Sequence, residues 1–239
     1  MSQRELIIAI DGPSGAGKST LSKLLAQHLG YVNIDTGAMY RAVALAASRR
    51  GIDLADEASL GRLAQQVQIG FRRRPEGEQV LLDGEDVSSA IRTPEISLLT
   101  SRVAACAAVR QAMVDLQRRM GQQGGVVLEG RDIGSVVFPG AEVKIFLSAS
   151  ARERGRRRHA ELRAKGLQVD LEQTIAEVEA RDAADSGREH APLVQPADAV
   201  VIDATALGIE EVLGQMLELT LQRRQARGLP PLAAAGDGR

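Results

Sequence analysis

Short apolar runs alternate with stretches of helical periodicity along most of the chain. Continuous apolar runs predict strands that are buried on both faces, and they occur at 6–10, 31–34, 126–128, 143–147 and 199–202. Apolar residues at helical spacing predict helices at 19–29, 38–50 and 97–120, with others starting near Ala151, Asp170 and Gly208. Strands that alternate with helices favour right-handed crossovers and a parallel sheet, so the pattern predicts an α/β fold.

Two segments interrupt this alternation. Short runs at 67–71, 79–82 and 85–87 are separated by polar turns, which predicts a small antiparallel sheet inserted into the α/β core. The segment from Arg152 to Lys165 is rich in arginine. At the C-terminal end, residues 226–239 carry Gly, Pro and Ala without periodicity, and we expect them to form a disordered tail.

Composition excludes several classes of protein. The 239 residues carry 30 Lys and Arg against 31 Asp and Glu, and only 2% are aromatic, so the chain lacks the charge and the rings of a dedicated nucleic-acid binder. The single Cys106 has no partner for an internal disulfide, and three scattered histidines provide no metal-ligand cluster. The N-terminal apolar run is too short for a signal peptide or a membrane span, so we expect a cytoplasmic protein.

The most specific motif is Gly12-Pro-Ser-Gly-Ala-Gly-Lys-Ser19, which fits the phosphate-loop pattern G-x-x-x-x-G-K-[ST] and lies between a predicted strand and a predicted helix. Its glycines let backbone N–H groups turn toward a triphosphate, and the helix N-terminus adds partial positive charge. Lys18 can reach the β- and γ-phosphates, while the Ser19 hydroxyl can take a place on Mg²⁺. The motif predicts a nucleoside triphosphate but not how it is used.

Other polar groups follow the predicted strands, at the edge where α/β folds bind ligands. The strand at 126–128 leads through Glu129 into Gly130-Arg-Asp132. Although 126–129 superficially resembles a strand that ends in a water-activating carboxylate, the Arg and Asp that follow suit a second substrate better. The chain also lacks the Asn-Lys-x-Asp base reader of a GTPase switch.

Further candidates come from three other segments. Thr36, Tyr40 and Arg41 follow the second strand, and Ser101 and Arg110 fall on the predicted helix 97–120. Arg181, Asp185 and Arg188 share one helix face if that helix continues far enough, although such a trio alone also fits a surface ion pair. Together these groups supply cations for a second phosphate, with carboxylates and hydroxyls for a sugar or base.

The chain resembles the bacterial cytidylate kinase family, within the nucleoside monophosphate kinase group, over roughly residues 5 to 222. The matching motifs are Ile10-Asp-Gly-Pro-Ser-Gly-Ala-Gly-Lys18, Asp35-Thr-Gly-Ala-Met-Tyr-Arg41, Ile91-Arg-Thr93, Gly130-Arg-Asp-Ile-Gly134, Val137-Phe-Pro139, Lys144-Ile-Phe-Leu147, Arg181-Asp182 and Ala191-Pro-Leu193. The resemblance implies a three-layer P-loop fold with a five-stranded parallel sheet. It also implies a core domain at 1–59 and 100–225, a monophosphate-binding insert at 60–99 that holds the small antiparallel sheet, and a short Arg-rich lid at 152–168.

The resemblance also implies the roles of individual residues. Those expected at CMP are Thr36, Tyr40, Arg41, Ser101, Arg110, Arg131, Asp132, Arg181, Asp185 and Arg188. Ser101, Arg110 and Asp132 are expected nearest the cytosine, with Asp185 and Arg181 nearest the ribose. Those expected at ATP are Gly12, Pro13, Ser14, Gly15, Ala16, Gly17, Lys18, Ser19, Thr20, Arg154 and Arg158. Lys18, Arg131, Arg157 and Arg188 are expected to act in catalysis, with the lid arginines swinging in over the phosphates on closure.

The implied reaction transfers the γ-phosphoryl group of ATP, with Mg²⁺, to CMP or dCMP. A phosphomonoester is mostly a dianion at neutral pH, since its second pKa is about 6, so no general base is required. The alternatives are a kinase for UMP, AMP or a shikimate-like alcohol, and a P-loop ATPase or nucleotide sensor that acts through a protein partner. Nucleic-acid binding through the arginine-rich segment is disfavoured by the charge, and we expect a monomer.

Overall fold

The computed structural model describes residues 4–74, 77–164 and 166–232, and these form two compact units. The first unit joins Met1–Asn33 to Gln123–Arg239, and the second comprises Ile34–Gln122. The predicted domain boundaries at 59/60 and 99/100, and the lid at 152–168, remain predictions. Among the described residues, no helix is both long enough and apolar enough to cross a bilayer.

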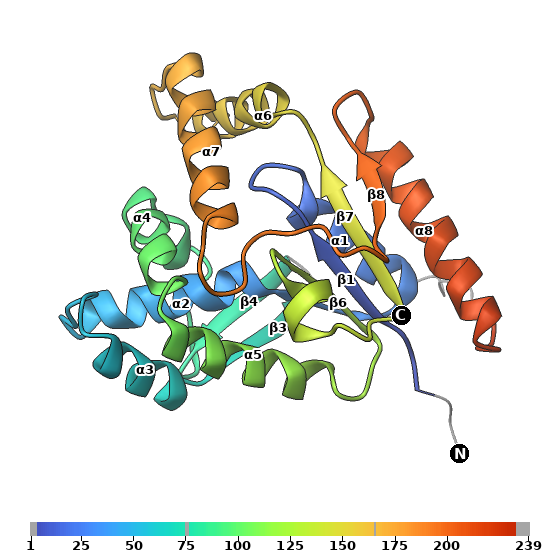
Figure 1. Cartoon of the computed structure of the whole chain (residues 1–239), viewed down its shortest axis with the longest axis horizontal. Coiled ribbons are helices and arrows are strands. Elements are labelled where there is room, and N and C mark those ends of the chain that lie inside the picture. The colour runs from blue at the N-terminus through green and yellow to red at the C-terminus, as the bar shows by residue number, and fades with distance from the viewer. Residues whose placement is uncertain (1–3, 75–76, 165, 233–239) are drawn as a thin grey trace. The chain divides into compact units, whose positions relative to one another are not determined.

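The first unit carries the parallel sheet that the sequence predicts, except for residues 34–35 at the end of one strand, which are counted with the second unit (Figure 1). The strands in the described chain run in the order β2-β6-β1-β7-β8, and the pairings of β1 with β6, β1 with β7 and β7 with β8 are parallel. Their bounds are β1 Ile7–Asp11, β2 Val32–Asp35, β6 Val126–Gly130, β7 Val143–Ser148 and β8 Val200–Asp203. Neighbours that are distant in sequence require crossovers, so the α/β prediction is confirmed.

Helices follow the strands of this unit. They are α1 Lys18–Leu29, the short π-helical turn η2 Ile133–Val137, α6 Ala151–Ala164, α7 Leu171–Ser186 and α8 Ile209–Ala226. α1 and α8 pack against each other and share the core of the sheet, where Ile8, Leu25, Val127 and Met216 are fully buried. α7 begins as predicted, because the Asp170 carboxylate accepts a hydrogen bond from the Gln173 N–H at 2.8 Å.

The second unit contains the predicted antiparallel sheet, in the order β3-β4-β5. Its elements are α2 Thr36–Arg49, α3 Glu57–Gln66, β3 Ile69–Arg74, β4 Gly77–Leu82, β5 Glu85–Asp86, the 3-10 turn η1 Ala90–Arg92, α4 Pro94–Val103 and α5 Ala107–Gly121. Of the polar turns predicted between these strands, the first, at residues 74–77, lies partly outside the described residues. Cys106 is buried as a free thiol.

The predicted helix at 97–120 is wrong, because the segment forms two helices. Thr93 caps α4 by accepting a hydrogen bond from the Ile96 N–H, and Pro94 follows at the first helical position. The break comes at Cys106, which is extended (φ −68°, ψ 119°). The change of direction lets α4 pack on α2 while α5 packs on α3, where a Cβ on Gly61 would lie 2.6 Å from that of Ala108.

The predicted disordered tail also needs correction. Residues 226–232 are described, and Leu229 is buried in the core of the first unit. Its backbone N–H donates to the Arg224 carbonyl at 3.0 Å, so the chain turns back after α8. The remainder of the predicted tail, 233–239, lies outside the described residues.

Candidate active site

The phosphate loop joins β1 to α1 and has the backbone that its glycines predict. Gly12, Gly15 and Gly17 have φ values of +149°, +78° and +99°. A Cβ on Gly12 would lie only 2.0 Å from the Leu147 carbonyl oxygen, so no other residue fits there without moving β7. Gly17 caps α1 without any side-chain hydrogen bond, which leaves the first N–H groups of the helix for an anion.

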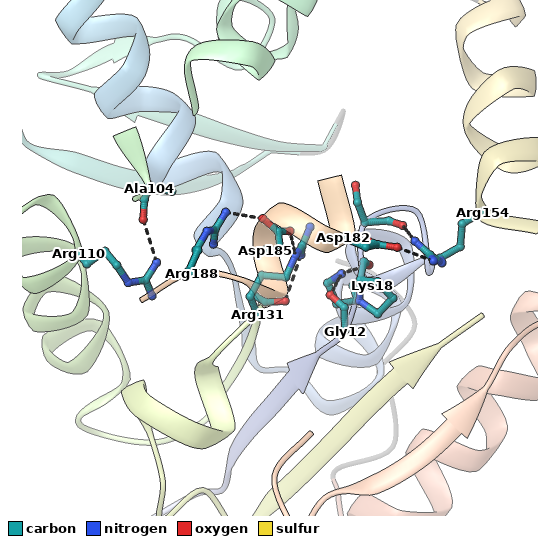
Figure 2. A network of polar contacts seen from close by, with 12 residues as sticks. Gly12, Lys18, Ala104, Arg110, Arg131, Arg154, Asp182, Asp185 and Arg188 are labelled. Atoms are coloured by element: carbon teal, nitrogen blue, oxygen red, sulfur yellow. Dashed lines mark hydrogen bonds and ion pairs between the residues drawn. The ribbon is translucent and has the colours of Figure 1, made fainter. Parts of the chain in front are cut away.

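Lys18 is buried and folded over this loop (Figure 2). Its ammonium group donates to the carbonyl oxygens of Gly12 at 2.7 Å and Pro13 at 2.6 Å. Burial, followed by the positive charge of Arg131, lowers the pKa of Lys18 well below its usual value. An anionic phosphate at the loop would offset both effects and would compete with the two carbonyl oxygens for this ammonium group.

Glu129 lies beside Ser19, a contact that sequence reasoning missed. The Ser19 hydroxyl donates to the Glu129 carboxylate at 2.8 Å, and Glu129 is buried at the end of β6. The two oxygens suit Mg²⁺, which takes one or two protein ligands and completes its shell with water and nucleotide phosphates. Among the described residues, no group of three or more His, Cys, Asp or Glu side chains could hold a metal alone.

Asp11 is a second buried carboxylate that the motifs did not identify. It ends β1, directly before the phosphate loop, and its two oxygens accept hydrogen bonds from the Ile133 N–H at 2.8 Å and the Gly134 N–H at 2.7 Å. Burial raises the pKa of Asp11 to about 6, although these two donors act in the opposite direction.

Asp185 forms ion pairs with two of the predicted arginines, Arg131 and Arg188 (Figure 2). Arg131 Nε donates to Asp185 Oδ2 at 2.7 Å, and Arg188 pairs with the other oxygen. Burial pushes the pKa of Asp185 upward, but Arg131, Arg188 and then Arg181 together hold it below its usual value. Because α7 ends at Ser186, Arg188 reaches Asp185 from the loop beyond the helix and not from its face.

The three predicted lid arginines differ in their contacts. Arg154 is buried, forms an ion pair with Asp182 at 2.6 Å and donates to the Ser14 carbonyl at 3.0 Å. Arg157 donates to the Ala204 carbonyl at 2.6 Å and, at 3.5 Å, to a carbonyl of the phosphate loop. Arg158 instead pairs with Glu161 at 2.9 Å on a partly exposed surface. Two of the three therefore already contact the loop backbone.

The second unit brings Tyr40 and Arg110 together. The Arg110 guanidinium is buried, lies 5.5 Å from the Tyr40 ring centre and donates to the Ala104 carbonyl at 3.3 Å. Ser101 lies on α4 and Arg110 on α5, so the single helix expected to carry both does not exist.

The start of α2 carries the remaining candidates of this unit. Asp35 caps α2 by accepting from the Ala38 N–H at 2.8 Å, and it pairs with Arg41 at 3.0 Å. Thr36, the first residue of the helix, is buried. The cap and the ion pair therefore hold the first turns of α2, which carry Thr36 and Arg41, in place.

Comparison with known proteins identifies relatives along nearly the whole chain. The family model described as cytidylate kinase matches residues 8–222. A cytidylate kinase from Syntrophotalea carbinolica is 68% identical, with 93% of this chain and 94% of the relative covered. Cytidylate kinases from Citrifermentans bemidjiense and Geobacter sulfurreducens are 60% and 59% identical, and the alignments cover 93% and 94% of this chain and 95% and 96% of those proteins.

Proposed function

The chain belongs to the cytidylate kinase family, and we propose that it transfers the γ-phosphoryl group of ATP to CMP or dCMP, giving ADP and CDP or dCDP. The observation that carries the proposal is that one compact unit holds both a phosphate loop with a buried Lys18 and a cluster of arginines about Asp185. A single-substrate ATPase needs the first but not the second.

On the ATP side, we propose that the loop residues from Gly12 to Thr20 surround the phosphates. Lys18 would exchange its two carbonyl partners for phosphate oxygens. The Ser19 hydroxyl, which contacts the Glu129 carboxylate, would hold Mg²⁺. The ion neutralises phosphate charge when it is bound. Arg154 and Arg157 support this assignment because they already donate to carbonyl oxygens of the loop, while Arg158 would have to leave Glu161.

On the acceptor side, we propose that Arg131 and Arg188 bind the monophosphate, because a guanidinium offers permanent charge and two parallel donors. Asp185 and Arg181 would contact the ribose. The cytosine edge has an amino donor beside ring acceptors, so a carboxylate or hydroxyl with an arginine complements it. The proposed set is completed by Thr36, Tyr40, Arg41, Ser101, Arg110 and Asp132.

The chemistry requires positioning more than proton transfer. The nucleophile is an oxygen of the CMP phosphate, which is already mostly dianionic at neutral pH. The residues therefore have to bring two anions together, hold them in line and exclude water as a competing acceptor. Lys18, Arg131, Arg157 and Arg188 would reduce the repulsion and stabilise the charge that develops on the transferred group.

The remaining parts of the proposal concern the chain's surroundings. We propose that the enzyme acts as a monomer in the cytoplasm and does not bind nucleic acid. The formal charge of −1 supports the absence of nucleic-acid binding. The free, buried thiol of Cys106 supports a reducing compartment such as the cytoplasm. Light scattering at micromolar concentration would test the monomer, and titration with single-stranded RNA at low salt would test the absence of nucleic-acid binding.

The test of the proposed function is a panel of acceptors supplied with ATP and Mg²⁺, with ADP release as the measurement. We expect CMP and dCMP to give the highest kcat/KM, above UMP, AMP and shikimate. ADP release that is independent of every acceptor would instead identify an ATPase or a nucleotide sensor.

Replacement of the loop lysine tests the same proposal at one residue. Lys18→Met should lower kcat by about 10²-fold or more, because the methionine cannot stabilise charge on the transferred group. Lys23→Met, on the same helix, is the matched control and should keep wild-type kinetics. Near-normal turnover of folded Lys18→Met would overturn the assignment.

A further inference from the structure

Asp11 links two segments that are far apart in the sequence. It is the last residue of β1 and is only 2% exposed. Both of its bonds reach the start of η2, where Oδ1 accepts from the Ile133 N–H and Oδ2 accepts from the Gly134 N–H, more than 120 residues along the chain. One carboxylate therefore joins the strand before the phosphate loop to the turn that follows Arg131 and Asp132.

The turn needs an acceptor at this point. The N–H groups of Val136 and Val137 donate to the Asp132 carbonyl at 2.9 Å and 3.1 Å, so the later donors are satisfied within the turn. The first N–H groups of any helical turn have no partner of their own. Asp132 precedes the turn, but its side chain does not cap it. The Asp11 carboxylate, at the end of β1, accepts from the first N–H groups of the turn instead.

The packing around Gly134 leaves the turn little freedom. A Cβ on Gly134 would lie 3.3 Å from Asp11 Oδ2 and 3.2 Å from Lys144 Cδ. Lys144 is itself fixed, because its ammonium donates to the Pro139 carbonyl at 2.5 Å and to Asp198 at 2.7 Å. The turn is therefore held between Asp11 and the side chain of Lys144.

We propose that Asp11 is a positioning residue for the acceptor nucleotide, which it serves by capping the turn that holds Arg131 and Asp132. The inference rests on the proposed function for what those two residues bind. Burial disfavours the ionised form of the Asp11 carboxylate, which is why it raises the pKa. The chain therefore retains a charge that costs free energy at a buried position where an apolar residue would pack more easily. Two bonds to backbone N–H groups explain why a carboxylate is kept.

Kinetics of Asp11→Asn separate positioning from a purely structural role. The amide has one acceptor oxygen, so one of the two backbone N–H groups loses its partner. We expect the KM for CMP to rise about tenfold while the KM for ATP stays within about twofold. Asp203→Asn is the matched control and should leave both KM values unchanged. Asp203 also ends a strand of this sheet, but within the described part of the chain its carboxylate accepts only from Thr205.

Hydrogen exchange tests the cap without the reaction. In the substrate-free enzyme, we expect the amide protons of Ile133 and Gly134 to be protected in the wild type and in Asp203→Asn, and to exchange faster in Asp11→Asn. If the acceptor panel shows no CMP kinase activity, the exchange result still tests the cap, so failure of the proposed function and failure of this inference are distinguishable.

Gly134→Ala perturbs the same contact if Asp11→Asn does not fold. It should also raise the KM for CMP more than the KM for ATP, because the added Cβ crowds Asp11 and Lys144. Unprotected Ile133 and Gly134 amides in the wild type, or equal changes in both KM values in the variants, would overturn the inference.

Discussion

Gly12 and Gly30 both have positive φ, but only Gly12 has a neighbour where a side chain would be. Gly30 follows α1 at φ +68°, and a Cβ there would have no described atom within 4 Å. Gly30→Ala should therefore cost about 1 kcal/mol of stability, from backbone strain alone. Gly12→Ala adds a collision with the Leu147 carbonyl and should cost about 3 kcal/mol or more. Urea denaturation of the two variants measures the difference, and equal losses would show that the loop moves away from β7 freely.

The residues of the site were predicted unevenly. The phosphate loop was predictable because each of its glycines and its lysine has a fixed place in one short motif. Asp11 and Glu129 were not assigned, because their partners lie 122 and 110 residues away and depend on β1 and β6 being neighbours. Periodicity predicts that strands exist, but it does not predict their order in the sheet.

α6 and α7 meet at a glycine. A Cβ on Gly155 would lie 2.4 Å from Ile175 Cγ1 and 2.9 Å from its Cα, so Gly155→Ala must push the two helices apart. We expect a loss of about 2 kcal/mol in stability. We also expect a higher KM for ATP, because Arg154 and Arg157 lie within two residues of Gly155 on α6 and contact the phosphate loop.

The matched control is Gly214→Ala in α8, because Gly214 is exposed and an added Cβ would have no atom of the described residues within 4 Å. Because alanine is the better helix former, this variant should gain about 0.5–1 kcal/mol. Thermal unfolding and ATP kinetics of both variants make the comparison. An unchanged KM for ATP in a destabilised Gly155→Ala would show that the Arg154 and Arg157 contacts do not depend on helix spacing.

The elements themselves were largely predictable, and the principal error has a physical cause. Each predicted strand of the parallel sheet, and the antiparallel sheet, is present within one or a few residues. The segment Val103-Ala-Ala-Cys-Ala-Ala around the break contains no Gly or Pro. Its local sequence therefore suits a continuous helix. Packing of α4 on α2 and of α5 on α3 overrides that local preference. The signal that was available, Thr93 followed by Pro94, marks the start of α4 and not its end.

Over the first unit as a whole, Arg224 connects the beginning of the chain to its end. The guanidinium is buried, pairs with Glu5 and donates to the Tyr31 hydroxyl at 2.5 Å and the Pro230 carbonyl at 2.9 Å. Burial and the bond to Glu5 raise the pKa of Tyr31 to about 12, so Tyr31 stays neutral. Composition alone suggested a frayed end, because a contact that spans 219 residues leaves no local pattern.

Removal of this arginine should destabilise the protein in a pH-dependent way. Burial pushes the pKa of Glu5 upward, but Tyr31 and Arg224 hold it below its ordinary value of 4.5. A carboxylate with a lowered pKa in the folded state adds stability above pH 4.5, and that stability is lost as the pH falls through the folded-state value. Arg224→Met should therefore cost about 2 kcal/mol at pH 7 and less near pH 4.

Arg223→Met is the matched control for this prediction, because Arg223 is exposed on the same helix and its loss should change stability by no more than about 0.5 kcal/mol. Urea denaturation at pH 7 and pH 4 compares both variants with the wild type. If Arg224→Met loses the same stability at both values, the side chain contributes by packing on Tyr31, whose ring centre lies 5.9 Å from the guanidinium, and not by its charge.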